Sequence, residues 1–262
     1  MRFFVTISYD GSGFSGWQIQ PNAPSVQEEV QKAFSTILGE QISVTGAGRT
    51  DTGVNAIGFV AHFDSNNGTV LKEHGKTIYK LNAILPEGIA VHSIVPVRND
   101  AHARFDAVSR TYKYYVHTSK DPFSRSHSWH CRFGLDIVRM NEAASLLLGR
   151  HDFRCFEKMH GNSSSSVCTV TRAEWTLDLD SVLPGEHLVF TVSANRFLRN
   201  MVRAIVGTLI EIGRGKRPPE WILEVMASGD RCKAGQSVPG NALFFTGIEY
   251  PESVFHTETE IL

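Results

Sequence analysis

Residues 25–46, SVQEEVQKAFSTILGEQISVTG, contain a helix with both of its end signals and the start of a strand. Ser25 and Glu28 form a capping box, which is a signature of a helix N-terminus. Apolar residues then recur every three or four positions, and Gly39 provides the left-handed conformation with which many helices end. The stretch predicts a helix that begins after Ser25 and ends at Gly39, followed by a strand near 42–46.

The segments on either side extend this stretch into an alternating order of strands and helices. Residues 2–10 and 57–64 have the alternating polarity of strands. A helix is expected near 76–84, before a strand near 89–97. The first half of the chain is therefore expected to have the order β-α-β-β-α-β.

The second half has the same order of elements without close similarity in sequence. Its expected elements are a strand at 109–117, a helix at 139–148, strands at 169–180 and 186–194, helices from Arg196 to Ile212 and from Pro219 to Ala227, and a strand at 243–250. The pattern predicts an α+β fold of two related domains with mainly antiparallel sheets flanked by helices. We place the domains at 1–104 and 105–262.

The overall composition is that of an ordinary globular protein. Of the 262 residues, 42% are hydrophobic and 20% are charged, and the net charge is −1. No apolar run approaches the roughly 20 residues of a membrane span, and the N-terminus lacks a secretion signal, so a cytoplasmic location is expected. The four cysteines lack CxxC spacing and the eleven histidines lack HExxH spacing, which argues against a zinc site.

Charge is unevenly distributed along this nearly neutral chain. Residues 196–217 contain six arginines or lysines and one acid, whereas residues 1–65 contain three basic residues and six acids. Such a positive segment can bind phosphates although the net charge is close to zero. In the expected helix, Arg196, Arg199 and Arg203 would share one flank, where one arginine would point at a site and the others would hold phosphates; an ordinary solvated face is the alternative.

Two glycine-rich loops invite a functional interpretation. The first, GAGRTDTGVNA at 46–56, places Arg49 and Asp51 among three glycines. Glycine allows positive φ and close approach of a ligand, so the loop suits a substrate site; a tight turn with a surface ion pair is the alternative. The second, GSGFSG at 11–16, matches the dinucleotide fingerprint by letter. That fingerprint must open a helix at once, and the helix here begins only after Ser25.

The strand at 109–117 contains several tyrosines. Tyr112 and Tyr114 fall on one face of it, because side chains alternate along a strand. A tyrosine in a strand is usually a core residue with a hydrogen-bonded hydroxyl. It can equally stack on a base of RNA.

Together, these motifs resemble the TruA family of tRNA pseudouridine synthases. The loop GRTDTGV, the strand SRTYKY and the helix FLRNMVRAIVG occur in the order that the family has. Shorter matches extend the resemblance over nearly the whole chain. These matches are YDG at 9–11, GWQ at 16–18, LNA at 81–83, ARF at 103–105, Gly149, and HDF at 151–153.

The resemblance implies an enzyme of the pseudouridine synthase fold that isomerises uridine in the anticodon stem-loop of tRNA, at tRNA positions 38, 39 and 40. It implies that Asp51 is the catalytic carboxylate and that Arg203 pairs with it. Arg49 would enter the RNA where the base flips out, Tyr112 would stack on the base, and Leu243 would line the base pocket. The family uses no metal or organic cofactor and acts as a homodimer, with tRNA lying across both subunits.

The chemistry suits a single carboxylate. Breaking the bond between the base and C1′ builds oxocarbenium character, which an ionised Asp51 stabilises or attacks, and no water is activated. Asp51 therefore either attacks C1′ or removes the C2′ proton to give a glycal. Candidates for contacts with the RNA backbone are Arg104, Arg196 and Arg199.

Two parts of the sequence depart from the family pattern. Asn55 stands where the family commonly has histidine, and QSVPGNAL at 236–243 departs from the usual APxxGL. Two alternative hypotheses are the same chemistry on a different RNA uridine and a tRNA-binding module without catalysis. The second would be expected to lack the carboxylate that Asp51 provides.

Overall fold

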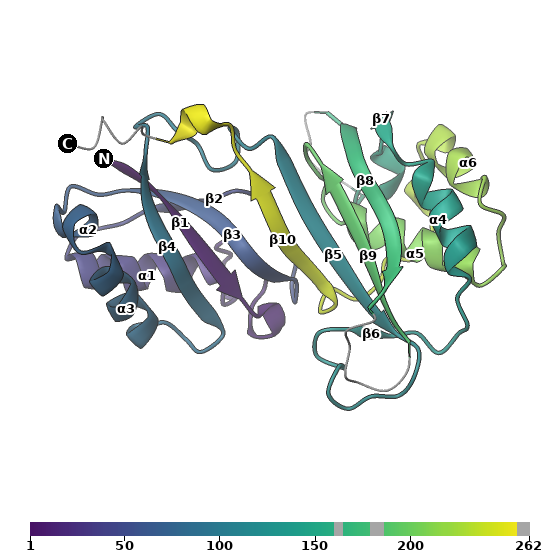
Figure 1. Cartoon of the computed structure of the whole chain (residues 1–262), viewed down its shortest axis with the longest axis horizontal. Helices are drawn as coiled ribbons and strands as arrows, with labels where there is room; N and C mark the ends of the chain where they lie inside the picture. The colour runs from purple at the N-terminus through teal and green to yellow at the C-terminus, as the bar shows by residue number, and fades with distance from the viewer. Residues whose placement is uncertain (160–164, 179–185, 256–262) are drawn as a thin grey trace. The chain divides into compact units, whose positions relative to one another are not determined.

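Two compact units make up the chain, Met1–Ser109 with Phe245–Leu262 and Arg110–Phe244. The computed structural model describes residues 1–159, 165–178 and 186–255 (Figure 1). The sequence-based division at 104/105 thus lies five residues before the division of the structure. That prediction also gave all of 105–262 to the second domain, whereas the structure assigns the chain from Phe245 onward to the first unit.

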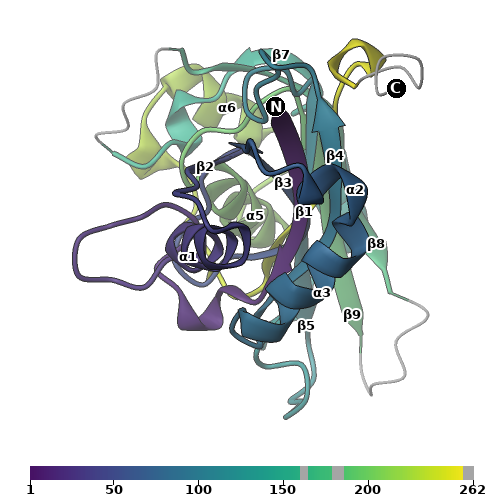
Figure 2. The ribbon, with the colours of Figure 1, turned by 90° about the vertical axis from the view of Figure 1, so that its left-hand side faces the viewer.

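The first unit contains a sheet whose strands pair antiparallel. The strand order is β4 (Ile89–Val97), β1 (Arg2–Tyr9), β3 (Asn55–Asp64) and β10 (Leu243–Glu249), of which Phe245 onward belongs to this unit, and β2 (Val44–Gly46) also pairs with β3. The helices of this unit are α1 (Val26–Leu38), α2 (Thr69–Lys72) and α3 (His74–Ile84). α1 packs against α3 and β2, while α3 packs against β4 (Figure 2).

Helix α1 begins and ends where the sequence predicts. The hydroxyl of Ser25 accepts the N–H of Glu28 at 3.4 Å, and Gly39 takes a left-handed φ of 69°. The helix inserts Phe34 into the core against Phe63 of β3, with ring centroids 4.7 Å apart. Local end signals and an apolar face together fix this element.

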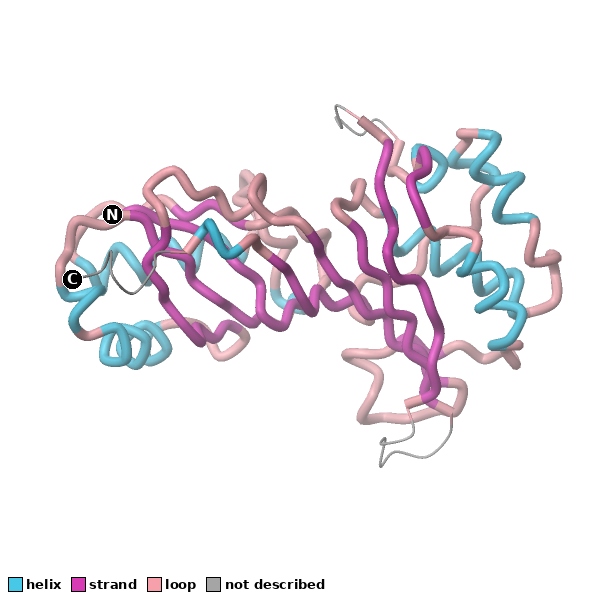
Figure 3. The backbone as a smooth tube through the Cα atoms, turned by 45° about the horizontal axis from the view of Figure 1, so that its top comes forward, coloured by secondary structure: helices cyan, strands magenta, loops and turns pink. Residues whose placement is uncertain are grey.

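The second unit also contains antiparallel strands, with its helices on one side of them (Figure 3). The strand order is β5 (Ser109–His117), β9 (His187–Ala194), β8 (Val167–Leu177) and β7 (Gly149–Asp152), and the short β6 (Trp129–His130) runs parallel to β5. The helices are α4 (Ile137–Ser145), α5 (Met201–Gly213) and α6 (Trp221–Ser228). Helix α4 packs against α5 and β8. The α+β class and the mainly antiparallel pairing are confirmed.

The second half differs from the predicted order in two ways. The strands β6 and β7 were not expected, because two to four residues are too short to show a period. Helix α5 begins at Met201, and the prediction that it begins at Arg196 is wrong. Asn200 has a φ of 66°, a left-handed conformation that a right-handed helix cannot continue through.

The composition predicted that the chain has no membrane span, and the spacing of the cysteines argued against a zinc site. No helix in the described ranges combines the length and apolarity needed to cross a membrane. All four cysteines are free thiols, and three of them, Cys131, Cys155 and Cys168, are buried. Burial raises the pKa of the Cys155 thiol to about 12 and that of Cys168 to about 11, so both are neutral at ordinary pH.

Candidate functional site

Asp51 lies in the loop of residues 47–54 that joins β2 to β3, hereafter the Asp51 loop. Thr50 beside it is buried, and its Oγ1 lies 3.0 Å from the hydroxyl of Tyr9 and accepts the N–H of Trp17 at 3.1 Å. Val54 donates its N–H to the carbonyl oxygen of Asp51 at 3.1 Å. The backbone is therefore held from both sides, while the Asp51 side chain remains partly exposed.

The glycine loop that follows β1 packs backbone to backbone against the Asp51 loop. A Cβ on Gly16 would lie 2.2 Å from the carbonyl oxygen of Thr50, and a Cβ on Gly11 would lie 2.3 Å from that of Val54. Gly16 also has a φ of +95°, which other residues rarely adopt. Because Gly11 and Gly16 of the GxGxxG pattern lack a Cβ, the backbones of the two loops can pack against each other.

Asn55, the first residue of β3, connects the same two loops. Its side chain is buried, and Oδ1 accepts the N–H of Gly11 at 2.8 Å. Without such an acceptor, this buried N–H would lose its hydrogen bond. We therefore classify Asn55 as a residue that positions the Asp51 loop, which accounts for the tolerance of asparagine where the family commonly has histidine.

Two of the predicted RNA-contacting residues, Arg49 and Arg104, also lie in the first unit, and both are exposed. The guanidinium of Arg104 lies 5.5 Å from the ring centroid of Phe105, which is 73% exposed. A cation next to an exposed aromatic ring is a combination that binds single-stranded nucleic acid through phosphate contacts and base stacking.

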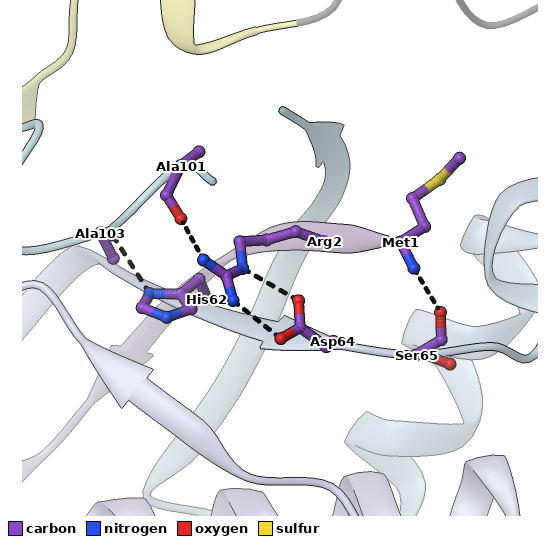
Figure 4. A network of polar contacts seen from close by, with 7 residues as sticks. All are labelled: Met1, Arg2, His62, Asp64, Ser65, Ala101 and Ala103. Atoms are coloured by element: carbon purple, nitrogen blue, oxygen red, sulfur yellow. Dashed lines mark hydrogen bonds and ion pairs between the residues drawn. The ribbon is translucent and has the colours of Figure 1, made fainter. Parts of the chain in front are cut away.

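A polar network fixes the backbone that leads to Arg104 (Figure 4). Arg2 donates two hydrogen bonds to the carboxylate of Asp64, at 2.9 and 2.8 Å, and a third to the carbonyl oxygen of Ala101 at 2.9 Å. Nδ1 of His62 accepts the N–H of Ala103 at 3.1 Å. Burial, with a smaller contribution from the charge of Arg2, lowers the pKa of His62 to about 4, so His62 is neutral at ordinary pH.

In the second unit, Tyr112 and Tyr114 differ in burial and in contacts. The hydroxyl of Tyr114 donates to the carbonyl oxygen of Pro239 at 3.0 Å, and burial raises the pKa of this fully buried side chain. Tyr112 is only half-buried and packs edge-on against Phe197, with ring centroids 5.0 Å apart. Tyr114 is therefore a core residue, and Tyr112 keeps exposed ring surface.

Arg203 lies on α5 and lines a cavity of about 460 Å³ in the second unit. Its Nε donates to the carbonyl oxygen of Val238 at 2.7 Å, and the N–H of Val238 donates back to the carbonyl oxygen of Arg203 at 3.3 Å. The guanidinium is thus oriented by backbone rather than left to rotate. Two aromatic residues, Trp129 and Phe133, also line this cavity, and the sequence did not indicate them because they follow no regular period.

The segment at 236–243, which departs from the family pattern, is packed directly on α5. A Cβ on Gly207 would lie 1.8 Å from the carbonyl oxygen of Gln236, so glycine is required on the helix. The hydroxyl of Ser237 accepts hydrogen bonds from Asn200 and Arg231, both at 2.7 Å. Leu243 at the start of β10 is buried, with 6% of its surface exposed.

Arg196 and Arg199 lie in the loop before α5 and do not share a helix flank with Arg203, which corrects that prediction. Arg199 is exposed, and its carbonyl oxygen accepts the N–H of Lys158 at 2.9 Å. Arg196 is half-buried. The predicted site residues thus form two groups, one in each unit; the first unit contains Arg49, Asp51 and Arg104, and the second contains Tyr112, Arg196, Arg199, Arg203 and Leu243.

No group of three or more His, Cys, Asp or Glu side chains within the described ranges could hold a metal ion. The chemistry that these residues offer is that of a carboxylate, several arginines and an aromatic ring. Such groups can stabilise a developing cation, bind phosphates and stack on a base.

Comparison with known proteins identifies relatives that are named as tRNA pseudouridine synthases. The sequence profile of a family described as tRNA pseudouridine synthase matches residues 143–251. A protein of Bacteroides thetaiotaomicron named tRNA pseudouridine synthase A is 50% identical, over 99% of this chain and 94% of the relative. A protein of the same name from Bacteroides fragilis is 47% identical, over 97% of this chain and 98% of the relative. Another from Parabacteroides distasonis is 46% identical, over 98% of this chain and 99% of the relative.

Proposed function

The chain belongs to the tRNA pseudouridine synthase family, and on this premise we propose that it is an isomerase that converts uridine to pseudouridine in tRNA. The observation that carries the proposal is the identity of 46–50% over nearly the full length of three proteins of that name. The target uridines in this proposal lie in the anticodon stem-loop, at tRNA positions 38, 39 and 40.

Asp51 is the catalytic carboxylate in the proposed reaction. The bond between C1′ and N1 of the base breaks, the detached uracil turns, and a bond forms between C1′ and C5. The proton on C5 is then lost while N1 takes up a proton, so that product and substrate are isomers. Asp51 either bonds to C1′ while the base is detached or removes the C2′ proton to give a glycal.

The structure of the Asp51 loop supports this role. Hydrogen bonds at Thr50 and Asn55, and the close approach of Gly16, fix the backbone around the carboxylate. A fixed backbone reduces the entropy lost when the reacting groups are aligned. Asp51 is half-buried, so part of the residue remains exposed to solvent.

The other predicted residues contribute binding. Tyr112 stacks on the flipped uracil, Leu243 lines the base pocket, and Arg203 binds substrate. Flipping a base out of its stack costs a few kcal/mol, which these contacts offset. The RNA-binding arginines are Arg49, Arg104, Arg196 and Arg199. The protein acts in the cytoplasm as a homodimer with tRNA across both subunits, without a metal or organic cofactor.

The test is to incubate the purified protein with unmodified tRNA transcripts and to map pseudouridine by mass spectrometry after chemical labelling. The wild-type protein should modify uridines of the anticodon stem-loop. Asp51→Asn should form no pseudouridine and still bind tRNA. The matched control is Asp100→Asn, which removes a carboxylate that is paired with Arg98 at the surface and should leave activity unchanged.

Three results would change the proposal. Full activity of Asp51→Asn would remove this carboxylate from the mechanism. Modification of uridines outside the anticodon stem-loop would favour the same chemistry on a different RNA site. Binding of tRNA by the wild-type protein, without conversion of any uridine, would favour a tRNA-binding module.

A further inference from the structure

The loop of residues 118–128 in the second unit, hereafter the Phe123 loop, exposes an aromatic ring. Phe123 is 79% exposed, the largest exposed fraction among the large hydrophobic side chains of the described residues. Exposing a phenylalanine costs the free energy that burial would provide, about 1.5–3 kcal/mol for a side chain of this size. A single exposed hydrophobic residue is common, so the surroundings of the ring decide whether it has a function.

The first relevant feature is that the loop is held in one conformation. The buried carboxylate of Asp121 accepts the N–H groups of Phe123 and Ser124, both at 3.0 Å, and also the hydroxyl of Ser124. At the other end, the hydroxyl of Ser128 is hydrogen-bonded to Nδ1 of His117 at 2.9 Å. The exposed ring is therefore carried by an anchored backbone, and less conformational entropy is lost when it binds.

The second feature is that the loop is attached next to the expected base pocket. Asn241 donates from Nδ2 to the carbonyl oxygens of Arg125 and Ser126, at 3.1 and 3.3 Å. Asn241 lies two positions before Leu243, which the proposed function assigns to that pocket. The segment that departs from the family pattern thus ties the Phe123 loop to the start of β10.

The third feature is the sign of the charges within the loop and the residues that follow it; an exposed acid of another segment, Glu186, lies at the start of the loop, where its carbonyl oxygen accepts the N–H of Thr118 at 3.2 Å. Asp121 is the only acid between residues 118 and 134, and it is turned into its own loop. Lys120 and Arg125 flank Phe123 and are exposed, as is Arg132 further along the chain. Exposed cations interleaved with an exposed aromatic ring match RNA, which offers phosphates and stacking bases together. A second copy of this loop would bring the same positive charges, and its one acid, Asp121, is already hydrogen-bonded within the loop.

We propose that Phe123 stacks on an unpaired base of the substrate tRNA near the target uridine, with Lys120 and Arg125 on the flanking phosphates. The inference rests on the proposed function and adds a substrate-binding element to it. Phe123 contributes affinity for the RNA and takes no part in breaking or forming bonds. The loss of base stacking of this kind weakens binding roughly 5- to 150-fold.

The experiment measures the Kd of tRNA for full-length protein carrying Asp51→Asn, so that binding is read without turnover. Phe123→Ala should raise the Kd about tenfold, and Phe123→Trp should restore it, because tryptophan also stacks. The matched control is Tyr79→Ala, which removes a ring that is 76% exposed on α3 and should leave the Kd unchanged. Lys120→Ala with Arg125→Ala should flatten the dependence of the Kd on salt.

Two further measurements make the result specific. The first uses a set of tRNAs, each with 2-aminopurine at a different unpaired position of the anticodon loop. For one of these positions, binding should change the fluorescence, and Phe123→Ala should abolish this change while Phe123→Trp keeps it. Sedimentation should give the same oligomeric state for all variants. An unchanged Kd in Phe123→Ala, or a changed oligomeric state with unchanged tRNA affinity, would overturn the proposal. A wild-type protein that binds tRNA but forms no pseudouridine would instead overturn the proposed function.

Discussion

The side-chain oxygen of Asn55 accepts the backbone N–H of Gly11 at 2.8 Å, and this bond joins the start of β3 to the glycine loop after β1. To accept this N–H, residue 55 needs a buried side chain that carries a hydrogen-bond acceptor and is long enough to reach Gly11. A neutral histidine also offers a ring nitrogen that accepts. The departure from the common family residue therefore preserves the function of the position.

Replacing Asn55 by Leu should destabilise the protein and slow pseudouridine formation. The substitution keeps the branching at Cγ but leaves the N–H of Gly11 buried without its acceptor, at a cost of about 1–3 kcal/mol. Urea unfolding and the rate of tRNA modification measure the two effects. Asn55→His should retain most of the stability and activity, and equal losses in the two variants would contradict the acceptor role.

Replacing Gly16 by Ala should disturb the Asp51 loop. The new Cβ would lie 2.2 Å from the carbonyl oxygen of Thr50, at a φ of +95° that alanine avoids. We expect a loss of at least about 2 kcal/mol in the free energy of unfolding, together with a fall in kcat. Gly13→Ala is the control, because a Cβ there meets nothing within 4 Å. Similar behaviour of the two variants would show that the loop contact has no effect.

The free energy of unfolding should fall as the pH is lowered from about 6.5 to about 4, in part because of His62. The folded protein keeps His62 neutral down to a pKa of about 4, whereas the unfolded chain takes up a proton near the ordinary value of 6.5. This difference contributes up to about 3 kcal/mol to the loss. His62→Gln should lose less stability over the same range, while His92→Gln, at an exposed position, should follow the wild-type protein. Parallel pH curves for all three would refute the assignment.

Replacing Arg199 by Ala should weaken binding to many tRNAs by a similar factor and flatten its dependence on salt. Arg199 is exposed in the loop before α5, where a phosphate contact is proposed, and each lost phosphate contact reduces the salt slope by about one. Arg196→Ala should act in the same direction. Binding isotherms at several salt concentrations provide the slope. A changed preference among uridines with an unchanged slope would indicate direct reading of a base.

The elements that the sequence predicted well are those with local signals. A capping box and a glycine define α1, and strand β5 occupies the predicted residues 109–117. The start of α5 was missed because Phe197 and Leu198 continue the helical period into the preceding loop. In the structure Phe197 instead packs against Tyr112 of β5, a contact that no local pattern encodes.

In the candidate site, too, features with a local sequence signal could be predicted and long-range contacts could not. The motif around Asp51 is visible in the sequence because its residues are contiguous. The groups that hold the loop are not visible, since Tyr9 and Trp17 lie 41 and 33 positions from Thr50, which they contact. The roles of Gly11 and Gly16 were obscured for the same reason, because the backbone that they approach belongs to another loop.

The assignment of β10 to the first unit has a consequence for the time course of synthesis. Val254 and the chain around it complete a core that also contains Phe4 and Val97. A ribosome adds roughly 5–20 residues per second, so this core waits roughly 7 to 27 seconds while the intervening residues 110–244 are made. The second unit is one continuous segment of the chain, so the ribosome completes it before it makes the last segment of the first unit. The part of the protein that is translated first is thus the part that finishes folding last.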